Sequence, residues 1–358
     1  MERRIIFNIS WVLIMGSCLF SQSLMNRLRV PITINGKIGI GYDNNFLRLS
    51  EKEIQNDYVK QYGITSTIDS PVFKPMGKII YSPVLSDKYT TNIVTSLSYS
   101  HFTQAEQKSY LIPKIAFEVK LKSYSWLKIG MRDIPQYYLR KYRDWDVSPV
   151  DYYSCSFSSR KYFGSYSMPL KWKRNTWIRF YTDFTQEYYN SHFTEFDLDK
   201  YLIQCDLNFQ NKKRHKFKLT AGHGNAKNIS YKSSLVSTLF DRSYVFDKIR
   251  TTFIYNDRKW KEISKVGISI LLEQRYYELV SDQFTFDNWK YYLDGRTTVW
   301  IDWDIMNNIG FKTSYQYRWR NADSQLFGDF EWVEDLKSYA KHEFWLEFSY
   351  EFLSDILY

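Results

Sequence analysis

Strict alternation of apolar and polar residues constrains this chain more than any other feature. In the last eighteen residues, 341–358, apolar or small residues occupy every second position from Phe344 onward. Glu347 and Glu351 lie between them, and Glu343 comes just before. A period of two places successive side chains on opposite faces, as in a β-strand whose two faces meet different surroundings.

The same alternation recurs along the whole chain after an apolar N-terminal stretch. Each alternating segment covers roughly 9 to 17 residues and ends at a turn or loop, as expected of strands. No helical periodicity, internal linker or change in composition interrupts the series. We count fourteen segments, at about 32–42, 74–83, 90–103, 109–122, 126–140, 156–170, 176–189, 198–210, 216–224, 243–255, 262–279, 289–305, 309–321 and 341–358.

The connections between the segments alternate in length. One set is short and polar, and the other set is mostly longer. Short connections at one end and long ones at the other are typical of transmembrane β-barrels, and an even strand count returns both termini to one side. The short connections are 86–89, 122–125, 171–175, 211–215, 256–261 and 306–308, and the long ones are 43–73, 141–155, 225–242 and 322–340.

These patterns predict an all-β fold, a closed antiparallel transmembrane β-barrel of fourteen strands, with twelve or sixteen as alternatives. A soluble sandwich of so many strands would need a second apolar layer, whereas a closed barrel in lipid needs none. A mean hydropathy of −0.47 fits this fold, because only alternate residues of each strand face lipid. Aromatic residues make up 19% of the chain and favour strand ends at a membrane interface.

The N-terminus has the pattern of a secretory signal. Arg3 and Arg4 precede a mostly apolar stretch at 5–20, and small residues follow. The stretch is too short and too weakly flanked for a stable spanning helix, although an uncleaved anchor is the alternative. We therefore expect a signal peptide at 1–21 and a barrel at 22–358.

The final strand carries a family resemblance. Tyr358 ends the chain, and Ile356, Phe352 and Tyr350 occupy alternate positions before it, with Ser354 as a departure. In this the chain resembles bacterial outer-membrane β-barrel proteins of the porin type. The resemblance implies a bacterial outer-membrane location, contact with outer-membrane lipid, and recognition by the barrel-assembly machinery of an assembly signal at Phe352, Ile356 and Tyr358.

A shorter resemblance covers residues 36–50, "GKIGIGYDNNFLRLS". This stretch is similar to the opening strand of fourteen-stranded barrels associated with surface-lipoprotein export. Those exporters carry a helical-repeat domain in front of the barrel, which we do not expect in this chain.

If the apolar face of each strand meets lipid, the charged face lines the lumen. The turn at 306–308 sets Asp302 opposite Lys312 and Arg296 opposite Arg318. Opposite charges across strands stabilise and like charges destabilise, so the lumen combines ion pairs with local basic spots. The expected lumen-lining residues are Lys114, Glu118, Lys120, Lys128, Arg132, Arg179, Asp183, Lys218, Lys248, Arg250, Lys265, Glu273, Arg275, Arg296, Asp302, Lys312, Arg318, Arg320, Glu343 and Glu347.

Two interpretations of this charged face remain open. It could line a water-filled pore whose basic excess attracts anions, or it could only solvate and brace the interior that every barrel needs. We expect no nucleic acid as a partner, because the aromatic residues lie on the face opposite the charges.

Metal, cofactor and catalytic sites receive little support from the sequence. Four histidines, 101, 192, 223 and 342, map near one rim, and His215 maps to a short turn at the other. None has the spacing of a metal-binding pair, so we expect no metal, no cofactor and no catalytic residues. Cys155 and Cys205 are predicted to be free thiols.

The longest connection, 43–73, is long enough to fold into the lumen as a plug or constriction. Ser50 and Glu53 have the spacing of a capping box and predict a short helix there. An extended external loop is the alternative.

Three functions follow from these patterns. The first is a passive channel for small hydrophilic, possibly anionic, solutes. The second is a barrel without a pore that acts through its loops as a receptor, adhesin or surface-protein assembly and export factor. A lumen filled by Trp177, Tyr181, Tyr292, Trp300 and Trp345 would favour it. The third is a lipid-modifying enzyme, which would need serine, histidine and aspartate together at the rim.

The final strand also yields a prediction. As the fourteenth strand, it should close the barrel against 32–42. Deletion of 356–358 should reduce membrane insertion, because the terminal aromatic and its apolar neighbour are removed. The membrane-inserted fraction after cell fractionation measures this, and unchanged insertion of the truncated chain would contradict the assigned role.

Overall fold

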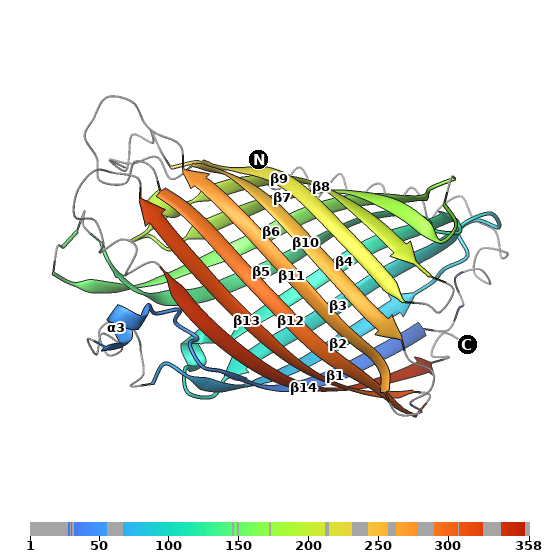
Figure 1. Cartoon of the computed structure of the whole chain (residues 1–358), viewed down its shortest axis with the longest axis horizontal. Coiled ribbons are helices and arrows are strands. Elements are labelled where there is room, and N and C mark those ends of the chain that lie inside the picture. The colour runs from blue at the N-terminus through green and yellow to red at the C-terminus, as the bar shows by residue number, and fades with distance from the viewer. Residues whose placement is uncertain are drawn as a thin grey trace.

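The chain forms a closed barrel of fourteen antiparallel strands (Figure 1). Each strand pairs with its neighbours in sequence, and β1 pairs with β14. The predicted fold and strand count are therefore confirmed. The structure is a computed structural model that describes residues 28, 30, 32–55, 67–144, 147–148, 150–171, 173–211, 215–230, 243–256, 263–277, 290–306, 308–324 and 338–354.

The strands lie close to the predicted segments. The expected β7 and β8 match to the residue, whereas β2 begins four residues earlier than predicted and β6 does the same. The strands are β1 Ile32–Asp43, β2 Ser70–Tyr81, β3 Thr90–Phe102, β4 Tyr110–Lys122, β5 Ser125–Arg143, β6 Tyr152–Pro169, β7 Thr176–Tyr189, β8 Leu198–Gln210, β9 Lys216–Asn228, β10 Tyr244–Asn256, β11 Ile263–Tyr277, β12 Lys290–Met306, β13 Ile309–Ser324 and β14 Tyr339–Ser354.

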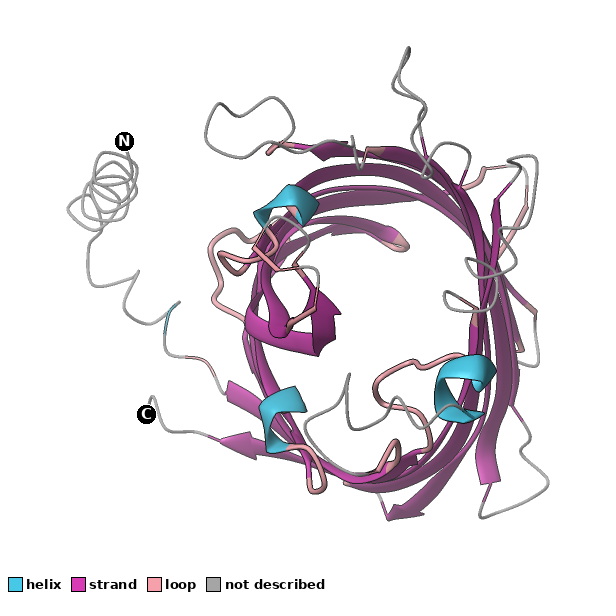
Figure 2. Cartoon of the chain, turned by 90° about the vertical axis from the view of Figure 1, so that its left-hand side faces the viewer, coloured by secondary structure: helices cyan, strands magenta, loops and turns pink. Residues whose placement is uncertain are grey.

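The two ends of the barrel differ. Three short helices lie at the end with the long connections: α3 (Glu51–Gln55), η1 (Glu106–Lys108) and η2 (Thr194–Phe196). Figure 2 looks along the barrel and shows them at its mouth. We call this the long-connection end, and the opposite end, where β1 begins and β14 stops, the short-turn end. No helix in the described residues is long and apolar enough to cross a membrane.

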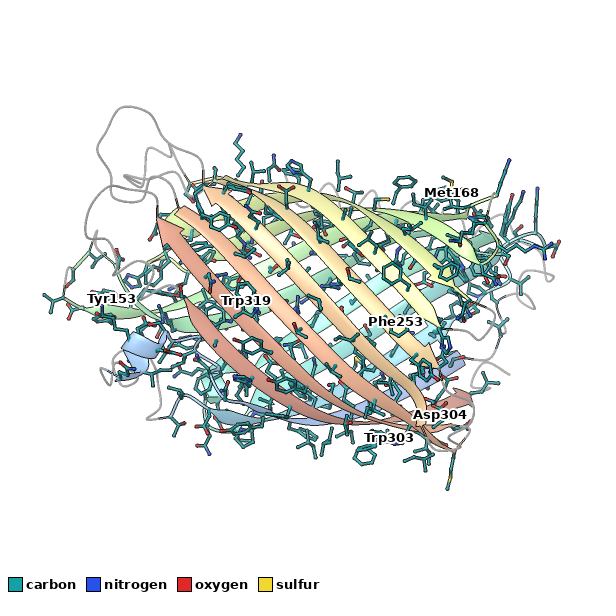
Figure 3. All side chains as sticks on the ribbon, viewed as in Figure 1. Tyr153, Met168, Phe253, Trp303, Asp304 and Trp319 are labelled. Carbon is teal, nitrogen blue, oxygen red and sulfur yellow. The ribbon has the colours of Figure 1, made fainter. Side chains whose placement is uncertain are left out.

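The alternation of the sequence becomes an apolar outer surface. Along β14, Phe344, Leu346 and Phe348 are half exposed, and Glu343 and Glu347 between them are shielded on the other face. Elsewhere on the outside, Ile203 is 73% exposed. Figure 3 shows side chains projecting all around this surface. Such an exposed apolar band would be a liability in water and suits the hydrocarbon of a bilayer.

Aromatic side chains border this surface towards the short-turn end. Phe311 lies between Trp303 and Phe348, with ring centroids 5.2 and 4.8 Å apart. Phe253 and Trp303 lie on this part of the outer face (Figure 3). Tyr162 and Tyr201 face outward further towards the long-connection end. Rings in these positions match the interfacial girdles of transmembrane barrels.

The predicted closing seam is confirmed. Residues 32–43 pair with 343–354 in continuous register, from Ile32 opposite Ser354 to Asp43 opposite Glu343. Phe352 of the proposed assembly signal faces outward and is 39% exposed. Ile356 and Tyr358 lie outside the described residues, as do the expected signal peptide at 1–21 and the last four residues of the expected final strand.

Two inward tryptophans lie against the barrel wall. A Cβ added at Gly267 would be only 2.1 Å from Trp300 Cζ2, and one at Gly41 would be 2.5 Å from Trp345 Cε3. Each indole therefore covers a glycine on the neighbouring strand, in the manner of aromatic rescue of sheet glycines. The rings are held at the wall, which argues against these two tryptophans as filling for the lumen.

This packing predicts a site-specific cost. Gly267→Ala should destabilise the barrel by about 1–3 kcal/mol, because the new methyl group displaces the Trp300 ring. Gly36→Ala is the matched control, since a Cβ there meets nothing within 4 Å. Urea unfolding in detergent micelles, followed by tryptophan fluorescence, measures both, and equal stability of the two variants would contradict the packing argument.

Candidate functional site: the charged lumen

The predicted lumen-lining residues all lie on the face opposite the apolar surface. In the described strands this follows from the alternation of successive side chains between the two faces of a strand and from ion pairs that join inward positions. Several charged residues that the prediction omitted belong to the same face, among them Lys78, Lys161, Lys200, Asp206 and Asp294. These residues could have been predicted from the sequence, because they alternate along the predicted segments in step with the charged residues named there.

Most inward acidic residues are neutralised by cations. Asp206 is fully buried and contacts Arg179 Nη2 at 2.6 Å and Lys218 Nζ at 3.0 Å. Asp294 accepts two hydrogen bonds of 3.0 Å from Arg320. Further pairs are Glu118 with Lys128, Asp183 with Lys161, Glu187 with Lys200, Glu273 with Arg275, and Asp43 and Glu343 with Lys341.

Cations remain in excess after this pairing. In register, Lys78 lies opposite Ser96, Ser96 opposite Lys114, and Lys114 opposite Arg132. Within the described chain, none of these three cations has an acidic partner within 4 Å, and Lys114 Nζ instead lies 5.3 Å from the Phe163 ring centroid. We call Lys78, Lys114 and Arg132 the basic row.

The predicted register of β12 and β13 is confirmed, but one predicted ion pair is wrong. Asp302 lies opposite Lys312, and Arg296 lies opposite Arg318. Lys312 Nζ, however, lies 5.4 Å from the centroid of the Trp300 ring, and the described residues contain no Asp302–Lys312 ion pair. Because Gly267 holds the indole against the wall, the ring offers Lys312 a cation–π partner next to its own strand.

The segment 44–55 folds inward from the end of β1. Ser50 and Glu53 form the predicted capping box, with the Ser50 amide donating to Glu53 Oε2 at 2.8 Å and the Glu53 amide to Ser50 Oγ at 3.1 Å. Phe46 and Leu49 are buried in one apolar cluster with Val72 and Phe102 on the barrel wall. The segment therefore narrows the long-connection end, as one of the two predictions for 43–73 required, while 56–66 lies outside the described residues.

An ion pair ties this segment to the wall. Arg140 Nη1 of β5 donates to Glu53 Oε2 at 3.0 Å, and both side chains are almost fully buried. Glu53 thus caps its own helix and also forms an ion pair with Arg140 of β5. Separating the two partners would leave a buried charge unpaired, which is costly. The ion pair therefore constrains the position of the loop strongly.

Lys108 of η1 is a buried cation at the same end. Its Nζ donates to the carbonyl oxygens of Tyr138 at 2.7 Å and Leu139 at 3.1 Å, and it lies 4.6 Å from the Tyr137 ring centroid. Burial lowers the pKa of the Lys108 ammonium to about 8.

The histidines have separate partners. His101 Nδ1 lies 3.3 Å from Ser109 Oγ, whereas His192 and His223 contact Asp144 at 2.9 Å and Asp247 at 2.8 Å. The serine and the aspartates therefore contact different histidines. His342 bonds the Tyr315 hydroxyl at 2.7 Å, and His215 lies in the short turn before β9.

Metal-binding side chains and thiols are the other groups that could form a site. Among the residues that the structure describes, no group of three or more His, Cys, Asp or Glu could hold a metal ion. Cys155 and Cys205 are free thiols, as predicted.

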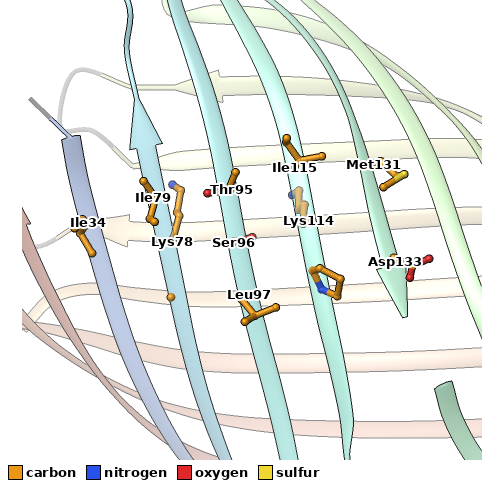
Figure 4. Close-up of a pocket in the computed structure, with 12 residues that line it drawn as sticks. Ile34, Lys78, Ile79, Thr95, Ser96, Leu97, Lys114, Ile115, Met131 and Asp133 are labelled. Carbon is orange, nitrogen blue, oxygen red and sulfur yellow. The ribbon is translucent and has the colours of Figure 1, made fainter. Parts of the chain in front are cut away.

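A hollow lies along the barrel wall between β1 and β5. Its volume is about 430 Å³, and its lining includes the outward residues Ile79, Leu97 and Ile115 (Figure 4). Lys78 and Lys114 of the basic row also belong to the lining, although its accessible surface is mainly apolar.

The pKa of Lys108 predicts a pH dependence of stability. A folded-state pKa of about 8, below the ordinary value of 10.5, means that the charged form is disfavoured in the folded state. The unfolded chain binds more protons between these values, so the free energy of unfolding should rise from about pH 8 to pH 10.5. Urea titrations of the wild type and Lys108→Met in micelles measure the difference, and parallel pH profiles would contradict it.

Comparison with known proteins finds only distant structural likenesses. No protein-family model and no curated protein matches the sequence. Solved structures that resemble it are outer-membrane porin-like barrels. OmpT of Vibrio cholerae is 6% identical, with 90% of this chain and 97% of that chain covered and a TM-score of 0.45. The anion-selective porin of Comamonas acidovorans is 6% identical, with 90% and 99% covered and a TM-score of 0.43.

Proposed function

We propose that the chain is an outer-membrane channel for small hydrophilic, anionic solutes. The observation that carries the proposal is the excess of cations on the inward face after its acidic groups are paired. The apolar outer surface supports insertion in the outer membrane, with the short-turn end in the periplasm and the long-connection end outside. Outer-membrane lipid and the barrel-assembly machinery are the proposed partners.

The electrostatic argument concerns where these cations lie. A lumen enclosed by low-dielectric lipid focuses the field of its wall charges, so unpaired cations raise the local concentration of anions. In the basic row, Lys114 of β4 lies directly opposite Arg132 of β5, and Ser96 of β3 separates Lys114 from Lys78 of β2. An anion that passes them meets positive charge without competing carboxylates within 4 Å among the described residues.

A barrel without a pore is the second candidate, and the infolded segment 44–55 favours it. The packing of Trp300 and Trp345 against glycines favours an open lumen. We therefore propose that segment 44–55 forms a constriction of the channel.

Planar-bilayer recording tests the proposal. Purified full-length protein should give discrete conductance steps in potassium chloride, and a salt gradient should give a reversal potential of the sign set by chloride. Absence of conductance steps from folded, inserted protein would overturn the channel. Steps with a reversal potential set by potassium would overturn the anion preference.

The basic row predicts which charges set selectivity. The double variant Lys114→Gln and Arg132→Gln should lower the chloride-to-potassium permeability ratio about threefold, because each unit charge contributes up to about 1 kcal/mol at a few ångströms in water. Lys227→Gln, on the outward face of β9, is the control that removes a cation outside the lumen. The reversal potential in a salt gradient measures both, and equal ratios for the two proteins would contradict the assignment.

A further inference from the structure

Three guanidinium groups without acidic partners converge at the long-connection end. Arg296 of β12 lies directly opposite Arg318 of β13, and Arg318 lies opposite Lys341 of β14. The turn that carries Arg48 lies against β14, the neighbour of β13: the Asn45 side chain donates to Ala340 O at 3.0 Å, and the Asn44 amide donates to His342 O at 3.2 Å. In the described part of the chain, no acidic group lies within 4 Å of these three arginines. Like charges in such proximity repel one another, so the arrangement is costly without an anion.

The nearby carboxylates are already occupied. Asp294 contacts Arg320 at 3.0 Å and Arg275 at 3.5 Å. Asp43 and Glu343 share Lys341, at 2.6 and 2.8 Å. Among the described residues these acids form their ion pairs with Arg320, Arg275 and Lys341, and none forms one within 4 Å with Arg48, Arg296 or Arg318.

Arg48 is held in place by its own turn. Its φ is 56°, a left-handed conformation that is unfavourable for a residue with a side chain. Asn45 opposes that cost: its side chain donates to Leu49 O at 2.8 Å and to Ala340 O of β14 at 3.0 Å. The Arg48 amide also donates to Asn45 O at 3.1 Å. The turn therefore fixes Arg48 relative to β14, next to the strand that carries Arg318.

Two buried donors at this place lack acceptors. Among the described residues, Arg48 Nε and the Tyr339 hydroxyl are buried and have no hydrogen-bond partner. Tyr339 is only 6% exposed and interacts electrostatically with Arg48. Arg48 Nη2 donates to the Tyr137 hydroxyl at 3.4 Å. A buried donor without an acceptor destabilises the fold, and a ligand oxygen that accepted its hydrogen bond would remove this cost.

We propose that Arg48, Arg296, Arg318 and Tyr339 form a binding site for a dianionic oxyanion of the phosphate-monoester type. Three guanidinium groups from three elements offer donors from several directions, which suits a tetrahedral group of several oxygens. A single planar carboxylate uses one guanidinium fork and would leave the others unpaired. The site rests on the proposed anion channel and names the class of solute that the channel holds.

Two measurements test the site. With inorganic phosphate as the probe, the chloride current through single channels should fall as phosphate is added at pH 8, where the dianion dominates. Isothermal titration of the folded barrel in detergent should give saturable binding, and this readout does not require conduction. Arg48→Gly, which removes the guanidinium and tolerates the left-handed turn, and Arg318→Gln should each weaken both effects about tenfold.

The controls separate the two proposals. Arg160→Gln removes an outward arginine paired with Asp133 and should leave phosphate binding unchanged. Acetate at equal concentration should bind at least tenfold more weakly than phosphate. Phosphate binding without conductance would sink the channel and keep the site. Conductance with no phosphate binding, equal binding of acetate, or full binding by Arg48→Gly would overturn the site and leave the channel intact.

Discussion

Closure of the sheet is the constraint on which every other feature depends. Each strand of this chain hydrogen-bonds to two neighbours, and the seam between β1 and β14 leaves no free edge over residues 32–43. Hydrocarbon offers no partner to backbone amides and carbonyls, so only such a closed sheet can meet it with a continuous apolar surface. Closure also gives the chain its two faces, because alternation then separates an outside from an enclosed inside.

The enclosed face is built by local pairing rather than by uniform charge. Asp206 holds two cations and is fully buried, whereas the basic row has no acidic neighbour within 4 Å among the described residues. The wall is thus braced where acid and base meet and is left positive where they do not. Glycines contribute in a similar way, since Gly267 and Gly41 let the Trp300 and Trp345 rings lie flat.

The sequence was sufficient to predict the strands, the closing seam and the capping box of Ser50 and Glu53. These depend on local patterns, and the short connection predicted at 306–308 gave the observed register of Arg296 opposite Arg318. Features that depend on which of several neighbouring groups a side chain contacts in the folded barrel were not predictable. Lys312 meets the Trp300 ring instead of Asp302 because a glycine on a third strand positions that ring. Arg48 carries no sequence signal, since its place is set by Asn45 and a left-handed turn.

The infolded segment 44–55 combines local turn contacts with contacts to the barrel wall. Glu53 caps its own helix and also binds Arg140, and Asn45 closes its own turn and also binds the β14 backbone. Local turn chemistry therefore doubles as attachment to the wall at two points, one on β5 and one on β14. A loop fastened in this way can hold Arg48 against repulsion from Arg318, which a freely moving loop would relieve by withdrawing. The positive end of the lumen is thus maintained by neutral and paired contacts some residues away from the charges themselves.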